Sequence, residues 1–173
     1  MKKSLKARNN DLANTERQLE ILSNGIFKDE LPTFANKIKE TNQFPLRPKK
    51  LEILQINLGY MCNQVCAHCH VDAGPDRKEI MTIETMNQCL EVIKKTDAHT
   101  LDLTGGAPEM NPNFRWFVEE ASKAGIKDFI VRSNLTIIQA NKKYHDLPDL
   151  SKTPSPRCLS VFPRVQCGIE ETT

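Results

Sequence analysis

The chain has 173 residues, of which 39% are hydrophobic and 27% charged, so it can form the core of about one soluble domain. The 24 basic residues nearly balance the 22 acidic ones, and a net charge of +2 argues against nucleic acid as a partner. No stretch reaches the roughly 18 apolar residues of a membrane span, and no secretory signal follows the basic start, so we expect a cytoplasmic protein without membrane partners. Because cytoplasmic thiols stay reduced, the six cysteines indicate metal ligands, catalytic thiols or core residues rather than disulfides.

The first 50 residues predict a partly helical leader rather than a domain. Leu12, Leu19 and Leu22 recur at loosely helical spacing. The segment 44–50 contains two prolines, which lack the backbone donor that regular structure needs. We therefore expect this segment to be a linker to the part of the chain that follows.

From residue 51 the sequence alternates between expected strands and expected helices. The pattern predicts strands at 51–58, 99–104 and 127–138, helices at 82–96 and 113–124, and a weak fourth strand at 159–162. This alternation predicts an α/β protein with a parallel sheet, either doubly wound or a (β/α) barrel. In both, ligands bind where the strands end.

The two helices carry start signals of their own. Thr82 is expected to cap the first helix. For the second helix, Asn111 is the expected cap, Pro112 the first helical residue, and Gly125 the residue just past the end.

Three cysteines lie in one short loop after the first expected strand. Cys62, Cys66 and Cys69 have the spacing C-x3-C-x2-C in "CNQVCAHC". Free cysteines are often core residues, but the polar neighbours of these three argue against that reading. Structural zinc takes four ligands, usually in two pairs, and no residue here completes a second pair. The third reading is a [4Fe–4S] cluster, in which three thiolates leave one iron open to a substrate or cosubstrate.

The cysteine loop resembles the signature of the radical S-adenosylmethionine (radical SAM) enzymes. The resemblance implies that Cys62, Cys66 and Cys69 bind the cluster and that the open iron binds SAM, which is cleaved to methionine and a 5′-deoxyadenosyl radical. It also implies that His68, just before the last cysteine, lies near the adenine. A small-molecule substrate and an electron donor of the flavodoxin or ferredoxin type are implied as partners.

A second motif, "GGAPE", follows the second expected strand. Gly105 and Gly106 let the backbone approach a ligand closely, and Glu109 is a carboxylate able to pair with an ammonium group. Alone such a turn is a weak signal, but one βα unit after the cysteines it resembles the SAM-binding "GGE"-type motif. We expect these three residues to contact SAM. Arg132 and Asn134, at the end of the third strand, are expected to reach the ligand too, or else to be an ordinary polar strand end.

A longer stretch resembles the arsenosugar-biosynthesis radical SAM proteins. It comprises "LQINLGYMCNQVCAHCHVDAGPDR", "LDLTGGAPEMNPNFRWFV" and "SNLT", within about residues 46–150. The resemblance implies transfer of the 5′-deoxyadenosyl group to a methylated trivalent arsenical. Ser133 departs from the pattern, because a cysteine is expected before "NLT". Cys158 and Cys167 are all that matches a cysteine-rich C-terminal part.

Length sets the last expectation. Residues 51–173 have room for about four βα units, and barrels of this superfamily usually have more. We expect a C-terminally truncated, partial (β/α) TIM-like barrel of the radical SAM type, the N-terminal half only, made of a leader (1–50), a core (51–150) and an irregular tail (151–173). The alternative function is a non-catalytic iron–sulfur or zinc-binding fragment that needs a partner chain to complete the barrel.

Overall fold

The structure, a computed structural model, describes residues 3–23, 32–67, 69–147 and 158–159, the last two as backbone only. The chain divides into two compact units, one made of Leu5–Lys49 and the other of Met1–Ser4 with Lys50–Thr173. Among the described residues, no helix combines the length and the apolar character needed to cross a bilayer.

The unit Leu5–Lys49 consists of short helices held by local contacts. Its elements are η1 (Lys6–Arg8), η2 (Asp11–Ala13), α1 (Thr15–Ser23) and α2 (Phe34–Glu40). Asn10 caps η2 by accepting from the Leu12 amide (2.9 Å), and Thr33 caps α2 by accepting from the Asn36 amide (3.3 Å). Neither α1 nor α2 contributes a buried residue, so this unit has no core in its described part.

The other unit is a parallel sheet with helices. Its strands are β1 (Ile53–Asn57), β2 (Thr100–Thr104), β3 (Asp128–Val131) and β4 (Cys158–Leu159), which pair in parallel in the order β1-β2-β3-β4. Its helices are α3 (Ile83–Lys95), η3 (Pro108–Met110), α4 (Phe114–Lys123), α5 (Thr136–Ala140) and η4 (Lys142–Tyr144). The α/β class with a parallel sheet is confirmed. The described strands form an open sheet, so closure into a barrel stays a prediction.

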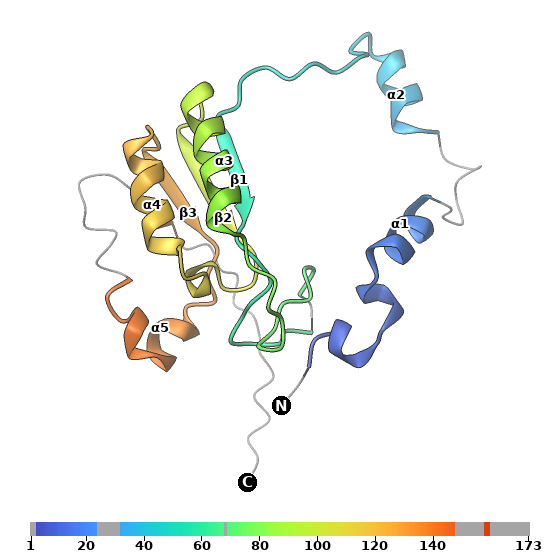
Figure 1. Cartoon of the computed structure of the whole chain (residues 1–173). Helices are drawn as coiled ribbons and strands as arrows, with labels where there is room; N and C mark the ends of the chain where they lie inside the picture. The colour runs from blue at the N-terminus through green and yellow to red at the C-terminus, as the bar shows by residue number, and fades with distance from the viewer. Residues whose placement is uncertain (1–2, 24–31, 68, 148–157, 160–173) are drawn as a thin grey trace. The chain divides into compact units, whose positions relative to one another are not determined.

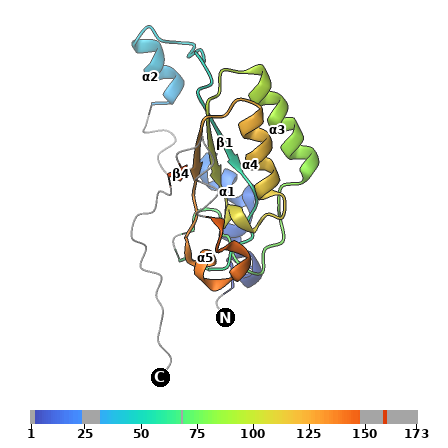
Figure 2. The ribbon, with the colours of Figure 1, turned by 90° about the vertical axis from the view of Figure 1, so that its left-hand side faces the viewer.

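One face of the sheet forms the core. Helices α3 and α4 lie side by side over this face (Figures 1 and 2). The strand register aligns Leu101 with Leu54 and Phe129 on this side. The helices add their own buried residues: Met86, Leu90 and Ile93 from α3, and Phe114, Phe117 and Ala121 from α4. Burial of this apolar stripe holds both crossover helices in place.

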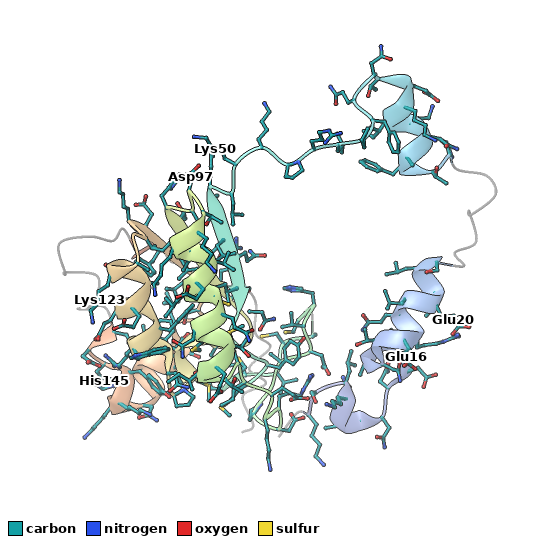
Figure 3. All side chains as sticks on the ribbon, turned by 45° about the horizontal axis from the view of Figure 1, so that its top comes forward. Glu16, Glu20, Lys50, Asp97, Lys123 and His145 are labelled. Atoms are coloured by element: carbon teal, nitrogen blue, oxygen red, sulfur yellow. The ribbon has the colours of Figure 1, made fainter. Side chains whose placement is uncertain are left out.

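Charged side chains line the opposite, solvent side of these helices and the amino ends of the strands. Lys123 of α4 contacts Glu120 one turn earlier (2.8 Å), and Lys50 lies 3.9 Å from Asp97 at the amino ends of β1 and β2 (Figure 3). These exposed pairs contribute little to stability. They keep the outer surface polar. Ligand sites of parallel α/β sheets lie instead at the carboxyl ends of the strands.

The helix-start predictions are half right. Thr82 caps α3 by accepting from the Thr85 amide (3.4 Å). Helix α4 begins at Phe114 rather than Pro112, but the expected cap is present, because the side-chain oxygen of Asn111 accepts from the Asn113 amide (2.9 Å). The side-chain NH₂ group of Asn111 donates to the Leu58 carbonyl (3.1 Å) and the Met81 carbonyl (3.0 Å).

The expected third strand is too long. Strand β3 ends at Val131, and the chain turns at Leu135, which has φ +59°. The Asn134 side chain accepts from the Thr136 amide (3.0 Å), and α5 starts there. A local side-chain hydrogen bond therefore replaces further sheet pairing. Of the expected fourth strand, only Leu159 lies within the described residues, in β4.

Candidate functional site

Past the ends of β1 and β2, two backbone hydrogen bonds join the loops that follow. The Gly106 amide donates to the Gly59 carbonyl (2.9 Å), and the Ala107 amide donates to the Met61 carbonyl (2.9 Å). Because Met61 directly precedes Cys62, these bonds fasten the GGAPE motif to the start of the cysteine loop. Two motifs separated by more than 30 residues of sequence thus share one edge of the sheet, where ligands bind to parallel α/β sheets.

Gly105 and Gly106 are required by the contact between these loops. Gly105 has φ +136°, and a Cβ there would overlap the carbonyl oxygen of Gly59. A Cβ on Gly106 would overlap the carbonyl oxygen of Met61, a backbone atom that cannot turn aside as a side chain would. The close neighbour of both glycines is therefore the cysteine loop, and their contact with SAM stays a prediction.

Cys62, Cys66 and Cys69 in this loop are thiols rather than members of disulfides. The sulfur of buried Cys62 accepts from the Gln64 amide (3.5 Å), and that of half-buried Cys69 accepts from the Ala73 amide (3.3 Å). Burial raises the pKa of the Cys62 thiol, the Gln64 amide opposes this, and negative charge on Cys69 adds to the rise. Backbone amides that point at sulfur are the donors that thiolate ligands use.

The three cysteines are the candidate metal ligands of this loop. Among the described residues, no three His, Cys, Asp or Glu side chains come close enough together to hold a single ion. A [4Fe–4S] cluster places each thiolate on a different iron, so its ligands need not converge on one point. Three thiols in one loop can meet that need. His68 lies outside the described residues.

Arg77 holds the long cysteine loop together and was missed by the sequence analysis. Its buried guanidinium pairs with Asp72 (3.3 Å) and Glu79 (3.0 Å) and lies over the Tyr60 ring, 4.6 Å from the centroid. Within the same loop, the Gly74 amide donates to the Tyr60 carbonyl (3.1 Å). An arginine between two acidic residues was the available signal, but the same pattern is common on exposed surfaces.

Glu109 is a buried carboxylate with half of its hydrogen-bonding capacity unused. The Ser133 hydroxyl donates to Oε1, while Oε2 is buried and has no partner among the described residues. Burial raises the pKa of Glu109, and the hydrogen bond from Ser133 opposes that rise. Negative charge on Glu109 contributes to the raised pKa of Cys62, so the two groups are close. A ligand ammonium group would satisfy the orphaned oxygen.

Ser133 has a structural partner of its own at the position where the resemblance expects a cysteine. Besides donating to Glu109, its hydroxyl accepts from the Leu135 amide (3.0 Å). The serine therefore shapes the turn after β3 and orients Glu109 at the same time.

Asn134 contacts the cysteine loop directly. Its side-chain amide donates to the Asn63 side chain (2.9 Å) and approaches the Cys62 sulfur (3.5 Å). The site thus gathers Cys62, Glu109, Ser133 and Asn134 from three successive loops.

Arg132 forms an ion pair with Asp102, and its contact with SAM stays a prediction. Its Nε donates to one oxygen of Asp102 (2.8 Å) and its Nη2 to the other (2.9 Å). Gln55 donates to the same carboxylate (2.7 Å), which links β1, β2 and the end of β3. Burial works to raise the pKa of Asp102, but the hydrogen bonds from Arg132 and Gln55 outweigh it and lower the pKa.

Gln55, Asp102 and Arg132 belong to a polar face of the sheet, opposite the face that forms the core. A pocket of about 370 Å³ opens on it, lined by Gln55, Asn57, His70, Val71, Thr104 and Arg132. The sequence analysis predicted Arg132 but missed the others. The available signal was alternation: Gln55 and Asn57 in β1, and Asp102 and Thr104 in β2, fall on every second residue, whereas strands covered on both faces are continuously apolar.

Comparison with known proteins gives a partial and distant match. No family model matches the chain. Probable GTP 3′,8-cyclases are similar over 86 residues: the protein of Sulfolobus acidocaldarius is 24% identical, that of Saccharolobus islandicus (strain L.S.2.15) 28%, and that of Sulfurisphaera tokodaii 23%. Each match covers 50% of this chain and 28% of the relative.

GTP 3′,8-cyclases are radical SAM enzymes, which is the superfamily that the cysteine spacing indicated. The matches are too distant to carry a substrate, and none of them supports the arsenosugar-specific resemblance. They support, at the level of the superfamily, an enzyme that uses a [4Fe–4S] cluster and SAM. The similarity therefore supports placing this chain in the radical SAM superfamily.

Proposed function

We propose that this chain binds a [4Fe–4S] cluster through Cys62, Cys66 and Cys69, and SAM beside it. The bound cluster would supply the electron that cleaves SAM to methionine and a 5′-deoxyadenosyl radical. The observation that carries the proposal is Glu109, whose buried, unpartnered Oε2 lies in the same group as the buried Cys62 thiol. Burying a carboxylate without a second partner is costly, so a cationic ligand group is the expected complement.

The residues of the chain have separate parts in this proposal. Glu109 would receive the SAM ammonium group, with Ser133 holding the carboxylate in orientation. Asn134 would support the Cys62 sulfur. Gly105 and Gly106 keep the two loops together, so that cluster and SAM would be held at a fixed separation.

The substrate is a finer proposal. The resemblance of the loop sequences favours a methylated trivalent arsenical, with the 5′-deoxyadenosyl group transferred to it. An electron donor of the flavodoxin or ferredoxin type would reduce the cluster. The arsenical is tested by incubating the reconstituted protein with SAM, reductant and the arsenical, and looking for the adenosylated product by mass spectrometry.

The cofactor proposal is tested by anaerobic reconstitution of the full chain with iron and sulfide. We expect a brown protein with bound iron and sulfide, and loss of the chromophore in the variant Cys62→Ala/Cys66→Ala/Cys69→Ala. Cys89→Ala is the matched control, because Cys89 lies on α3 against the core and away from the loop. Tight stoichiometric zinc without iron would contradict the cluster.

Catalysis has its own readout. With dithionite and SAM, the reconstituted chain should release 5′-deoxyadenosine, measured by chromatography. A chain that keeps its cluster but releases none would be a non-catalytic iron–sulfur protein, which is the second candidate function, and it would need a partner chain to act.

A further inference from the structure

The polar pocket on the exposed face of the sheet is not used by the residues proposed to hold cluster and SAM. None of the three cysteines and neither Glu109 nor Asn134 lines it. It is nevertheless next to them in the chain, because His70 follows Cys69 and Thr104 precedes Gly105. Its volume of about 370 Å³ falls in the range of small-molecule sites.

Arg132 is set in this pocket in a fixed orientation. Two of its nitrogens are held by Asp102, whose side chain is only 6% exposed, while 44% of the Arg132 side chain remains accessible. Gln55 fixes the same carboxylate from β1. A guanidinium held in this way loses little conformational freedom when it binds a ligand.

Among the described residues, the lining of the pocket includes several side chains with hydrogen-bond donors and no carboxylate. Asp102 lies beneath Arg132 and is not among the lining residues. The side-chain oxygen of Asn57 accepts from the Gly59 amide (2.8 Å). The NH₂ group of the same side chain can therefore donate to a ligand. Thr104 adds a hydroxyl group. Donors arranged round a guanidinium are the arrangement that recognises carboxylate and phosphate oxygens.

We propose that this pocket binds an oxyanion, carboxylate or phosphate, of the small molecule on which the enzyme acts, with Arg132 as the main contact and Asp102 as its positioning residue. Calling that molecule the substrate rests on the proposed function, but oxyanion binding by the pocket does not. The two can therefore fail separately.

The test uses the full chain without iron, so that it is independent of cluster and SAM. Sodium phosphate and sodium succinate are titrated against the ¹⁵N-labelled protein, with sodium chloride at matched ionic strength. We expect saturable shifts of the Arg132 Nε–H and of the side-chain amides of Gln55 and Asn57. Stronger binding of one probe identifies phosphate or carboxylate as the group recognised.

Variants identify the contact. Arg132→Gln should weaken the binding of the preferred probe by about tenfold or more, which is the size expected for a hydrogen bond to a charged group. Arg132→Lys keeps the positive charge but lacks the paired N–H donors of the guanidinium, so its affinity for the probe should lie between those of the wild type and Arg132→Gln. If Arg132→Gln fails to fold because Asp102 is left alone, the double variant with Asp102→Asn removes both charges and should show the same loss. Arg115→Gln is the control, because Arg115 pairs with Asp146 on the exposed side of α4.

The positioning role of Asp102 has a separate readout. In Asp102→Asn the Arg132 Nε–H should exchange faster with water, and anion affinity should fall although the protein has become more positive. Tighter binding in Asp102→Asn would contradict positioning by Asp102.

Three further results would overturn the proposal of the pocket. They are the absence of shifts with both probes, equal binding by wild type and Arg132→Gln, and displacement of the probe by S-adenosylhomocysteine, which would assign the pocket to the carboxylate end of SAM.

Discussion

At the scale of single residues, Glu109 shows a conflict between stability and ligand binding. Its carboxylate is buried, one oxygen receives the Ser133 hydroxyl, and the other has no partner among the described residues. An unsatisfied buried acceptor costs about 1–3 kcal/mol, so the ligand-free protein bears a local penalty at this position. Sites that must bind a charged group commonly carry such a penalty.

Replacing Glu109 by Gln should stabilise the cluster-free protein at pH 7 by about 1 kcal/mol, since a neutral amide is less costly to bury than a carboxylate. The pKa of Glu109 is raised in the folded state, so the unfolded chain ionises first as pH rises. Below about pH 4.3, the pKa of glutamate in the unfolded chain, Glu109 is protonated in both the folded and the unfolded state, so burying it carries no charge penalty. As the pH rises above this value, the penalty grows until the pH passes the pKa of Glu109 in the folded state. Urea denaturation at pH 7 and pH 4 should therefore show the gain only at pH 7.

The control for that substitution is Glu119→Gln, on the exposed side of α4. It should change stability at neither pH. A gain in Glu109→Gln that persists at pH 4 would contradict the ionisation argument, and unchanged SAM cleavage in that variant would contradict the role proposed for Glu109.

At the scale of elements, the site is made by joining loops that follow different strands. The GGAPE loop is fastened to the cysteine loop by backbone hydrogen bonds at Gly106 and Ala107. Asn111 adds a third connection, because its side chain donates to the carbonyls of Leu58 and Met81, one at each end of the cysteine loop. These hydrogen bonds join residues that are close in space but far apart in the sequence.

Gly106→Ala should separate these loops. Its Cβ would overlap the Met61 carbonyl, so we expect a loss of about 1–3 kcal/mol, the usual cost of overpacking, together with poor cluster loading. Gly125→Ala is the comparison: it carries φ +117° but has no atom within 4 Å of the added methyl group. It should cost about 1 kcal/mol and leave cluster loading intact. Thermal unfolding and iron content measure both effects; equal loading in the two variants would contradict the role of Gly106.

At the scale of the whole molecule, the folded core belongs to one of the two units. The buried cluster that includes Leu101, Phe117 and Phe129 lies entirely within β1 to β3, α3, α4 and the loops between them. Of the described residues among the first 50, only Ser4 is buried, and its amide (3.3 Å) and its hydroxyl (2.5 Å) both donate to Asp76. The described helices α1 and α2 bury nothing.

A chain that starts at Lys50 should therefore unfold cooperatively and bind the cluster. It loses the two hydrogen bonds that Ser4 donates to Asp76 and should be less stable by their contribution. Full-length Ser4→Ala removes the hydroxyl donor and should reproduce most of that loss, as measured by urea denaturation. A much larger loss in the shortened chain than in Ser4→Ala would show that residues 5–49 stabilise the sheet directly.

Local signals predicted most of the core unit. Strands β1 and β2 and helices α3 and α4 lie within a few residues of their expected bounds, because apolar periodicity and the Thr82 cap act within one element. The end of β3 was predicted wrongly. There the Asn134 side chain accepts from the Thr136 amide, and this local hydrogen bond competes with further strand pairing.

The sequence by itself determined the parallel α/β order, the spacing of the three cysteines, and the position of both motifs at strand ends. Only the tertiary structure decided which polar groups meet: Ser133 with Glu109, Arg77 with Asp72 and Glu79, and Arg132 with Asp102. The physical reason is that alternation along a strand gives the face of each residue. Its partner on the neighbouring strand depends on register and loop conformation, which are set by packing of the whole sheet.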